Sequence, residues 1–426
     1  QNHLKMIKKE SSFYLDCMRS IWVSKYSCSK CNDPIFRKSP FRKYFRHKEY
    51  LVTNDDKKCI LHCQKDDWYE VEDNNRKSWK KSKDKILFFW KILDKYLRRS
   101  KENCYLENII FPIFYIETNF TYKHVIKKNI TILNCRFLDG MKFQHTTFEG
   151  NLTLLSLNSK DEFVFDYCNF NKEVYCELNH KEITSFEAKN IDLTFENCKF
   201  NENFLMYELD FSDCSLSFEN TMFNNLVDFH NTTFGNVNFT NTRFNDFAVF
   251  TDCIFHKPLN LRNTIFKGEA NFLDIKFTQL SNQETSRLIK HQFEKLNNKI
   301  EANKYHALEM EQHRRNNFES LKNSFLFDKE ISFENILNST ISCFHWLSSN
   351  HSSNWVYPLL WIFAISFITT WSLGFEITIN NSFKYINILS KIEDFNSSYI
   401  AMTLNKVSLG YLYYQFLTAV RKDTRK

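Results

Sequence analysis

The sequence predicts a mainly β fold, a solenoid of short stacked units with helical segments on either side, and three observations support this class. Between Phe195 and Phe277 a block recurs in which two large apolar residues lie five positions apart, as in Phe229-His-Asn-Thr-Thr-Phe234. Successive blocks restore the register every ten or eleven residues, which neither a helix period of 3.6 nor plain strand alternation produces. Such a short fixed period is typical of solenoids, whose units bury their apolar residues only by stacking on neighbours.

Composition agrees with this class. The chain has 44 Phe, which can stack as a continuous apolar core, but only 6 Gly and 5 Pro. So few Gly and Pro residues argue against a turn-rich sandwich and against long disordered linkers.

Charge is unevenly distributed along the chain. Lys and Arg outnumber Asp and Glu in residues 1–129, whereas acidic residues are in excess in residues 130–280. A basic front part could meet nucleic acid or anionic lipid, and a plain solvated surface explains it equally well.

The blocks resemble pentapeptide-repeat proteins, in which a large apolar residue at every fifth position and a small residue two positions earlier both point inward. The resemblance implies a right-handed quadrilateral β-helix of about twenty residues per coil, with roughly seven coils over residues 130–280. The repeat is regular over 195–277 and less regular over 130–194. The small inward positions would be those of Cys135, Cys168, Cys198, Cys214, Thr221, Thr232, Thr242, Cys253 and Thr264. The large inward positions would be those of Phe137, Phe170, Phe200, Leu216, Phe223, Phe234, Phe244, Phe255 and Phe266.

The 13 cysteines do not form the even set expected of a disulfide framework. Five of them occupy small inward positions of the repeat, where a thiol acts as a compact hydrophobe. We therefore expect the bulk of the chain to be cytoplasmic and reduced.

A zinc site is expected ahead of the repeats. Cys28-Ser-Lys-Cys31 is followed by Cys59-Ile-Leu-His62-Cys63, and two close ligand pairs on facing turns are what tetrahedral Zn²⁺ requires. The best ligand set is Cys28, Cys31, Cys59 and His62, with Cys63 as a substitute for His62. Some pentapeptide-repeat proteins carry a similar knuckle of the form Cys-x-x-Cys then Cys-x-x-His, which favours His62. With four protein ligands the ion would be structural; the alternative is a set of free thiols.

Two segments around the repeats are predicted to be helical caps. Residues 78–100 have an amphipathic pattern, and we expect that helix to pack on the zinc knuckle or to cover the first coil, which begins near Ile109–Phe114. Residues 283–318 show apolar positions spaced four and three apart, with Asn303 as the polar member. This heptad pattern predicts one helix, which either pairs with itself in a homo-oligomer or lies across the last coil.

Two transmembrane helices are predicted near the end of the chain. Residues 354–373 are apolar and uncharged over the length of one bilayer crossing, with Trp355, Tyr357 and Trp371 placed like interfacial anchors. Residues 399–420 form the second candidate.

The second candidate, residues 399–420, contains Asn405, Lys406 and Gln415, so it would need a partner helix in lipid; an interfacial helix is the alternative. The basic run that follows should stay cytoplasmic. The resemblance to membrane-anchored bacterial members of the family places the chain in the bacterial inner membrane, multi-pass, with most of it cytoplasmic.

No catalytic constellation is evident. A Gly-rich phosphate loop is absent from the sequence, and His230 and His256 have no acidic or cysteine partner at a fixed spacing. The recurring residues Asn197, Asn220, Asn231, Asn241 and Asn263 are expected to bond turn backbone between coils. We expect no enzyme activity and no cofactor other than structural Zn²⁺.

Three function classes remain. The first, which we favour, is a membrane-anchored scaffold that presents the rod to an unidentified protein partner. The second is a DNA mimic that inhibits a nucleic-acid enzyme, and the basic front part and the membrane segments disfavour it. The third is a two-helix channel regulated by the rod, and the loop 375–398 has no Gly for a carbonyl filter.

The expected organisation has four parts. They are a basic zinc-knuckle and cap module (1–105), the β-helix (106–280), the heptad-patterned helix (281–325) and the membrane region (326–426).

Overall fold

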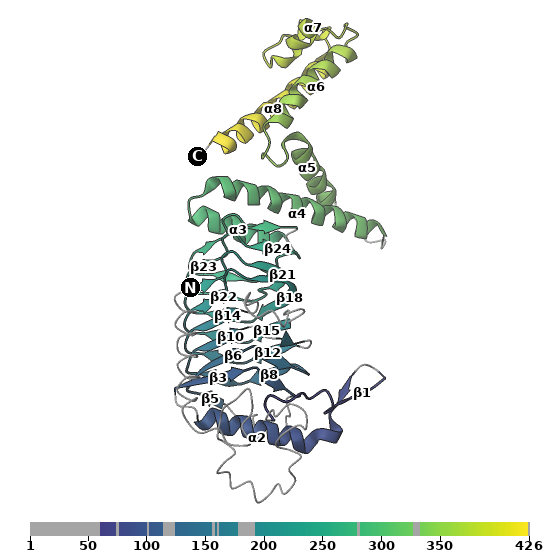
Figure 1. Cartoon of the computed structure of the whole chain (residues 1–426). Coiled ribbons are helices and arrows are strands. Elements are labelled where there is room, and N and C mark those ends of the chain that lie inside the picture. Colours follow the sequence, from purple (N-terminus) through teal and green to yellow (C-terminus); the bar gives the residue numbers. More distant parts are fainter. Residues whose placement is uncertain are drawn as a thin grey trace, which may run out of the picture. The chain divides into compact units, whose positions relative to one another are not determined.

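The computed structural model describes residues 60–73, 76–99, 102–113, 124–155, 158–159, 162–177, 192–278, 282–326 and 333–424. The chain divides into two compact units, and their boundary runs through the last coil of a β-solenoid. The first unit extends to Pro258 and includes Thr264–Gly268 and Leu273–Thr278. The second comprises Leu259–Asn263, Glu269–Phe272 and the chain from Gln279 onward (Figure 1).

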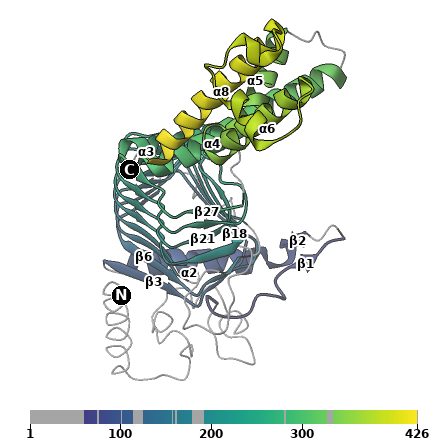
Figure 2. The ribbon, with the colours of Figure 1, turned by 90° about the horizontal axis from the view of Figure 1, so that it is seen from above.

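Parallel strands stack into four sheets, which form the sides of the solenoid (Figure 2). The eight-stranded sheet contains β3 (Asn103–Glu107), β6 (Asn129–Leu133), β10 (Leu152–Leu155), β14 (Val174–Glu177), β17 (Phe204–Leu205), β20 (Val227–Asp228), β23 (Ala248–Val249) and β26 (Ala270–Asn271). One seven-stranded sheet contains β8 (Met141–Gln144), β12 (Phe163–Asp166), β15 (Asp192–Glu196), β18 (Asp210–Glu219), β21 (Thr233–Asn238), β24 (Ile254–Phe255) and β27 (Lys276–Phe277). The other contains β5 (His124–Ile126), β9 (Thr146–Phe148), β13 (Asn169–Phe170), β16 (Lys199–Phe200), β19 (Met222–Phe223), β22 (Arg243–Phe244) and β25 (Ile265–Phe266). The three-stranded sheet contains β4 (Ile110–Phe111), β7 (Arg136–Phe137) and β11 (Asn158–Ser159).

The strand register gives the coil length. Leu152 pairs with Val174, 22 positions later, and Val227 pairs with Ala248, 21 positions later. The coil from Val174 to Phe204 is longer, at 30 residues. The predicted β-solenoid is therefore confirmed, with about seven turns and coils slightly longer than twenty residues.

Phenylalanine rings form columns inside the coils, as the five-residue spacing predicted. One column contains Phe148, Phe170, Phe200, Phe223, Phe244 and Phe266, with neighbouring ring centroids 4.6–5.1 Å apart. A second contains Phe143, Phe165, Phe195, Phe218 and Phe239 at 4.9–5.4 Å. Both columns consist of offset aromatic stacks, which add directional contacts to the burial of apolar area.

The small inward residues bond to the coil before them. The hydroxyl of Thr221 donates to the Phe195 carbonyl at 3.0 Å, and that of Thr232 donates to the Met206 carbonyl at 3.1 Å. Cys253 lies at the same position, with its Sγ 3.0 Å from the Phe229 carbonyl. Burial raises the pKa of the Cys253 thiol to about 12, so this thiol is a structural side chain and not a nucleophile.

The coil corners explain the recurring asparagines. The residues Asn108, Asn134, Asn197, Asn220, Asn231, Asn241 and Asn263 all have φ between +50° and +57°. Asparagine tolerates this left-handed conformation better than other residues with a Cβ. At Asn197 and Asn231 the backbone N–H also donates to a carbonyl of the next coil, and the side chain of Asn134 donates to that of Asn108 at 2.6 Å, so backbone and side chain both contribute at these positions.

Helix α2 (Lys83–Arg99) covers the first coil, as one of the two predictions for residues 78–100 stated. It follows the hairpin β1 (Glu70–Val71) and β2 (Lys77–Ser78) and the 3₁₀ turn η4 (Lys80–Ser82). Phe89 is buried with its ring 5.8 Å from that of Phe111, and Trp90 Nε1 donates to the Ile113 carbonyl at 3.1 Å. Ahead of α2, the Leu61 carbonyl accepts from Ile110 N–H at 3.1 Å. Leu61 thus supplies the acceptor that a neighbouring coil would otherwise supply.

The prediction of one helix over residues 283–318 is wrong, because the chain reverses direction within it. Helix α3 (Gln283–Lys295) ends before Asn297, which has φ +61°, and α4 (Lys299–Leu326) begins after Asn298. Asn298 caps α4, since its side-chain oxygen accepts from Glu301 N–H at 3.2 Å. The two helices pack on each other, with the rings of Phe293 and Tyr305 stacked at 5.4 Å.

Side chains of α3 bond to the backbone of the last coil. Thr285 Oγ1 accepts from Leu261 N–H at 3.1 Å, Glu284 Oε1 from Asn263 N–H at 2.9 Å, and Gln292 Oε1 from Ala270 N–H at 3.2 Å. In earlier coils the equivalent N–H groups donate to the following coil, as Val227 does to Phe247. Helix α3 therefore supplies the acceptors that another coil would supply, which confirms the capping alternative.

The remaining helices are α5 (Phe333–Ser349), α6 (Val356–Ser372), α7 (Ile379–Phe383) and α8 (Tyr399–Thr424), with the 3₁₀ turns η5 (Lys384–Ile386) and η6 (Ile392–Phe395). Helices α6 and α8 pack side by side through Ile362, Leu409 and Leu412 (Figure 2). The segment between α6 and α8 folds back on itself. Within it, Tyr385 Oη donates to the Asp394 carbonyl at 2.8 Å.

Candidate functional site

The helices α5, α6 and α8, which we call the helical module, bury polar side chains where a soluble bundle buries apolar ones. The buried polar residues of the module and its connections are Ser339, Ser342, Ser348, Ser349, His351, Ser352, Ser366, Thr369, Thr370, Ser382, Ser390, Asn405 and Gln415. The described part of the module has a small apolar core, which consists of Ile362, Leu409 and Leu412 with partly buried neighbours.

Hydrogen bonds between helices hold this polar interior together. Gln415 of α8 accepts from both Ser349 and Ser352 at 2.9 Å, and Asn405 of α8 donates to Thr369 of α6 at 2.9 Å. The hydroxyls of Ser348 and Tyr411 are 3.1 Å apart. Two of the polar residues noted in 399–420, Asn405 and Gln415, thus face partner elements of the same module.

The outer surface of the module is apolar. On α8, Tyr399, Ile400, Leu404, Val407, Tyr414 and Leu417 are each at least 64% exposed. On α6, Leu360, Ile368 and Trp371 are more than half exposed. A helical module with polar contacts inside and large apolar side chains outside reverses the usual arrangement of a water-soluble domain, and apolar exposure on this scale marks an interaction surface.

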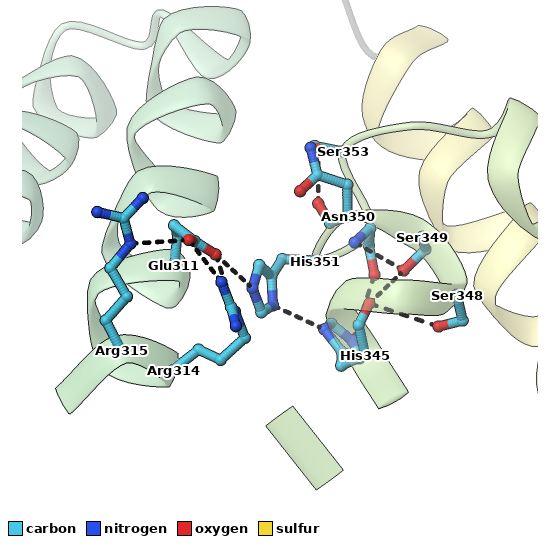
Figure 3. A network of polar contacts seen from close by, with 10 residues as sticks. Glu311, Arg314, Arg315, His345, Ser348, Ser349, Asn350, His351 and Ser353 are labelled. Atoms are coloured by element: carbon cyan, nitrogen blue, oxygen red, sulfur yellow. Dashed lines mark hydrogen bonds and ion pairs between the residues drawn. The ribbon is translucent and has the colours of Figure 1, made fainter. Parts of the chain in front are cut away.

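A second network joins α4 to the turn between α5 and α6 (Figure 3). Glu311 accepts from Arg314 at 2.7 and 3.0 Å and from Arg315 at 2.9 Å. On its other side, Glu311 Oε2 lies 3.9 Å from His351 Nε2. The Nδ1 atoms of His345 and His351 are 3.4 Å apart, so one ring must be the donor and the other the acceptor.

His351 is buried and held neutral. Its Nε2 atom makes no hydrogen bond to any residue that the structure describes. Burial, followed by the positive field of His345, lowers the pKa of His351 to about 4. The imidazole is therefore uncharged at neutral pH.

The backbone at this turn adopts an uncommon conformation. Asn350, His351 and Ser352 have φ of +48°, +56° and +59° in succession. Each is left-handed and has a Cβ, so each is higher in energy than in a right-handed conformation. Local bonds hold the turn, among them Ser352 N–H to Ser349 Oγ at 2.9 Å. The Ser- and His-rich run 345–353 was the only sequence signal of this network.

The two predicted transmembrane segments, 354–373 and 399–420, coincide with α6 and α8. In the part of the chain that the structure describes, no helix is both long enough and apolar enough for a membrane crossing.

Three of the predicted zinc ligands, Cys28, Cys31 and Cys59, lie outside the described residues. The fourth, His62, is buried, and its Nε2 lies 3.0 Å from the Glu107 carbonyl. A carbonyl only accepts, so Nε2 carries a hydrogen, as the second ring nitrogen of many metal-bound histidines does. Cys63, the substitute ligand, is buried with Sγ 3.6 Å from the Ile60 carbonyl. Among the residues with described positions, no group of three or more His, Cys, Asp or Glu could hold a metal ion.

The outer face of the solenoid carries a second candidate surface. The ring of Tyr207 lies 4.8 Å from that of His230 and 6.0 Å from that of Tyr175. Carboxylates border this row, since Asp228 bonds to His230 at 2.8 Å and Tyr175 donates to Glu177 at 3.1 Å. Partial burial and then the field of Asp228 raise the pKa of Tyr207.

One row of acidic residues on the solenoid is short. Asp166, Glu196 and Glu219 occupy the same position in three successive coils. Another outward row contains the cations Lys199 and Arg243. This mixed distribution does not resemble the continuous negative charge of a duplex, so it does not favour DNA mimicry.

The stacked coils define the chain as a β-solenoid protein. Residues 218–265 match the family of pentapeptide repeats, with 9 copies. This stretch includes Phe218, Phe223, Phe229, Phe234, Phe239 and Phe244, which the structure buries, so the resemblance noted for the repeats is supported there. No curated protein and no solved structure is significantly similar to the chain.

Proposed function

We propose that this protein is a membrane-anchored, non-catalytic scaffold, in which helices α6 and α8 of the helical module sit in a bilayer and the solenoid offers binding surface to a protein partner. One observation carries the proposal: the module buries its hydrogen-bonding side chains and exposes its apolar ones. In hydrocarbon this arrangement is favourable, because lipid covers the apolar surface and polar groups pair between helices.

The proposal requires α6 and α8 to insert as a pair, because no described helix has both the length and the apolar character of a membrane crossing. Helix α6 has 17 residues, about 26 Å at 1.5 Å per residue, against a hydrocarbon core of about 30 Å. Arg421 and Lys422 close α8 on one side, where cytoplasmic cations are expected. Two crossings, by residues 354–373 and 399–420 of a bacterial inner-membrane protein, remain our prediction.

Membrane fractionation of the full chain tests the anchor. We expect the protein to remain with membranes in alkaline carbonate and to be released by detergent. Leu404→Asp and Val407→Asp, on the outer face of α8, should weaken this association, because a charge in hydrocarbon costs about 2.5–3.5 kcal/mol. Ile265→Asp, at an exposed apolar position of the solenoid, is the matched control and should leave it unchanged. Recovery of the wild-type chain in the soluble fraction without detergent would reject the proposal.

We also propose that Cys28, Cys31, Cys59 and His62 hold a structural Zn²⁺ ahead of the first coil. The hydrogen bond that His62 donates from Nε2 supports this, because a bond from the second ring nitrogen orients a ligand histidine. Cys28→Ser should reduce the bound zinc of the purified chain. Cys343→Ser, which changes an exposed cysteine on α5, should not. Equal zinc content in the two variants would reject the site.

The partner is proposed to bind the outer face of the solenoid near the Tyr175, Tyr207 and His230 row, whose carboxylates suit a basic protein segment. A homo-oligomer through residues 283–318 is a second proposal, and because α3 caps the last coil, self-association would have to use α4. In that segment Ile289 and Phe293 are buried, whereas Ile300 is exposed. Cross-linking of detergent-solubilised protein, with and without Tyr207→Ala, separates a bound partner from self-association.

A further inference from the structure

Helix α5 is amphipathic, and its apolar side faces away from the rest of the protein. Six of its large apolar side chains are between 45 and 77% exposed, namely Phe333, Ile336, Leu337, Ile341, Phe344 and Leu347, and a seventh, Trp346, is 41% exposed. Their spacing of three, four and one residues places all six on one side of an α-helix. This side of α5 is thus mainly apolar over about 21 Å.

The opposite side of α5 carries small, polar, buried residues, beside the partly exposed Trp346 and the exposed Asn338. Ser339 and Ser342 are each 7% exposed, and Ser349 is fully buried, with its hydroxyl bonded to Gln415 of α8. Helix α5 therefore packs on its own protein through hydroxyl groups and directs its apolar groups away from it. A helix that faced water would have the reverse arrangement.

We propose that α5 lies in the interfacial plane of the bilayer, with its apolar side among the lipid acyl chains, as a contact additional to α6 and α8. The inference rests on the proposed membrane function and goes beyond it, because α5 was not among the predicted membrane segments. An in-plane orientation follows from its two unlike sides, since an interfacial helix meets lipid on one side and polar groups on the other.

Chemistry on and beside α5 favours lipid over a second copy of the chain. The six outward residues have no charge and no side-chain hydrogen-bonding group. A protein partner would therefore lack the polar contacts that fix its position and orientation on this surface. Helices α6 and α8, which pack on α5, also expose large apolar side chains.

One cation that is also paired with Glu311, Arg314, lies next to α5. The guanidinium of Arg314 stacks on Trp346 of α5 at 4.6 Å, and the side chain of Arg315 is 56% exposed. Tryptophan and arginine together suit the boundary between acyl chains and anionic headgroups.

Fluorescent labels at two positions of α5 test the proposal in the full chain. Phe344→Cys lies on the apolar side, and Asn338→Cys is an exposed position on the polar side; both are made in a Cys343→Ser background. Each protein is labelled with an environment-sensitive maleimide and reconstituted into vesicles of phosphatidylcholine and phosphatidylglycerol, with or without brominated acyl chains. The signal of Cys343→Ser alone is subtracted, to remove labelling at other cysteines.

We expect a blue-shifted emission at position 344, a large loss of it with brominated lipid, and a smaller loss at position 338. A chain that floats with the vesicles while position 344 emits as in water would overturn the role of α5 and leave the α6–α8 anchor intact. Emission at 344 that is shielded from water but not quenched by bromine would mean that protein, such as a second copy, covers α5, and would also overturn it. A chain that does not float with vesicles would reject the membrane function itself.

Discussion

At the scale of single residues, each coil corner depends on a residue with a left-handed backbone conformation. The pattern of apolar side chains did not predict this requirement. Asn220 has φ +51°, and its side chain is exposed, so its value lies in the backbone conformation it tolerates. Asn220→Ala should lower the free energy of unfolding by about 1–2 kcal/mol, the cost of a left-handed residue with an ordinary Cβ. Asn220→Gly should stay close to wild type because glycine adopts this φ without strain.

Thermal unfolding of the two variants shows whether Asn220 stabilises the chain through its backbone conformation or through a hydrogen bond of its side chain. If Asn220→Gly lost as much stability as Asn220→Ala, the amide group would be responsible and the backbone explanation would be wrong.

The neutral imidazole of His351 makes stability depend on pH. Its pKa is about 4 in the folded chain and about 6.5 in an unfolded one. Between these values the unfolded chain binds the proton that the folded chain excludes, so the free energy of unfolding falls as the pH is lowered from 6.5 to 4. The loss should be about 3 kcal/mol, because a difference of one pKa unit corresponds to about 1.4 kcal/mol.

His351→Asn removes the titrating ring, and asparagine tolerates the left-handed backbone at this position. We expect amide hydrogen exchange of residues 345–354 to accelerate on acidification in the wild type and to change less in the variant. An identical pH profile for both would contradict the assignment to His351.

At the scale of elements, side-chain amides form ladders along the solenoid. Asn201 donates to Asn171 at 2.7 Å, Asn224 to Asn201 at 2.8 Å, and Asn245 to Asn224 at 2.7 Å. The ladder ends at Asn245, whose buried Oδ1 has no hydrogen-bond partner in the described structure. The next coil places Lys267 at this position.

Lys267→Asn should extend the ladder by one member and stabilise the chain by about 0.5–1.5 kcal/mol, because a buried acceptor gains its donor. Lys257→Asn makes the same change of charge at an exposed position and serves as the control. A rise in the unfolding temperature for Lys267→Asn alone supports the ladder, and equal temperatures for both variants would argue against it.

The elements also show which features a single sequence reveals. The columns of phenylalanines were predictable because the coils repeat the same geometry, so residues at a fixed spacing in the sequence stack on one another. The break at Asn297 was hidden by a heptad pattern that continues on both sides of it, although Asn297 and Asn298 are residues that end and begin helices. The outward side of α5 could not be predicted, because periodicity shows that a helix has two sides and not which one is buried.

At the scale of the whole molecule, the ends of the solenoid are closed by non-repeat segments. Unpaired N–H groups of a terminal coil would otherwise offer an edge to other chains. At the start, residues 60–63 and α2 bond and pack on the first coil. At the end, Gln292 is buried and its Oε1 accepts from Ala270 N–H.

Gln292→Leu keeps the size of the side chain and removes the acceptor, so the buried N–H of Ala270 loses its partner, at about 1–3 kcal/mol. Gln312→Leu makes the same change on α4 and should have a small effect. Hydrogen exchange at Ala270 gives the local readout, and we expect it to accelerate in Gln292→Leu well beyond its rate in Gln312→Leu. Wild-type exchange at Ala270 in Gln292→Leu would show that α3 does not supply this acceptor in solution, and the cap would then have to act through apolar contacts such as those of Ile289 and Phe293, which are buried in the same helix.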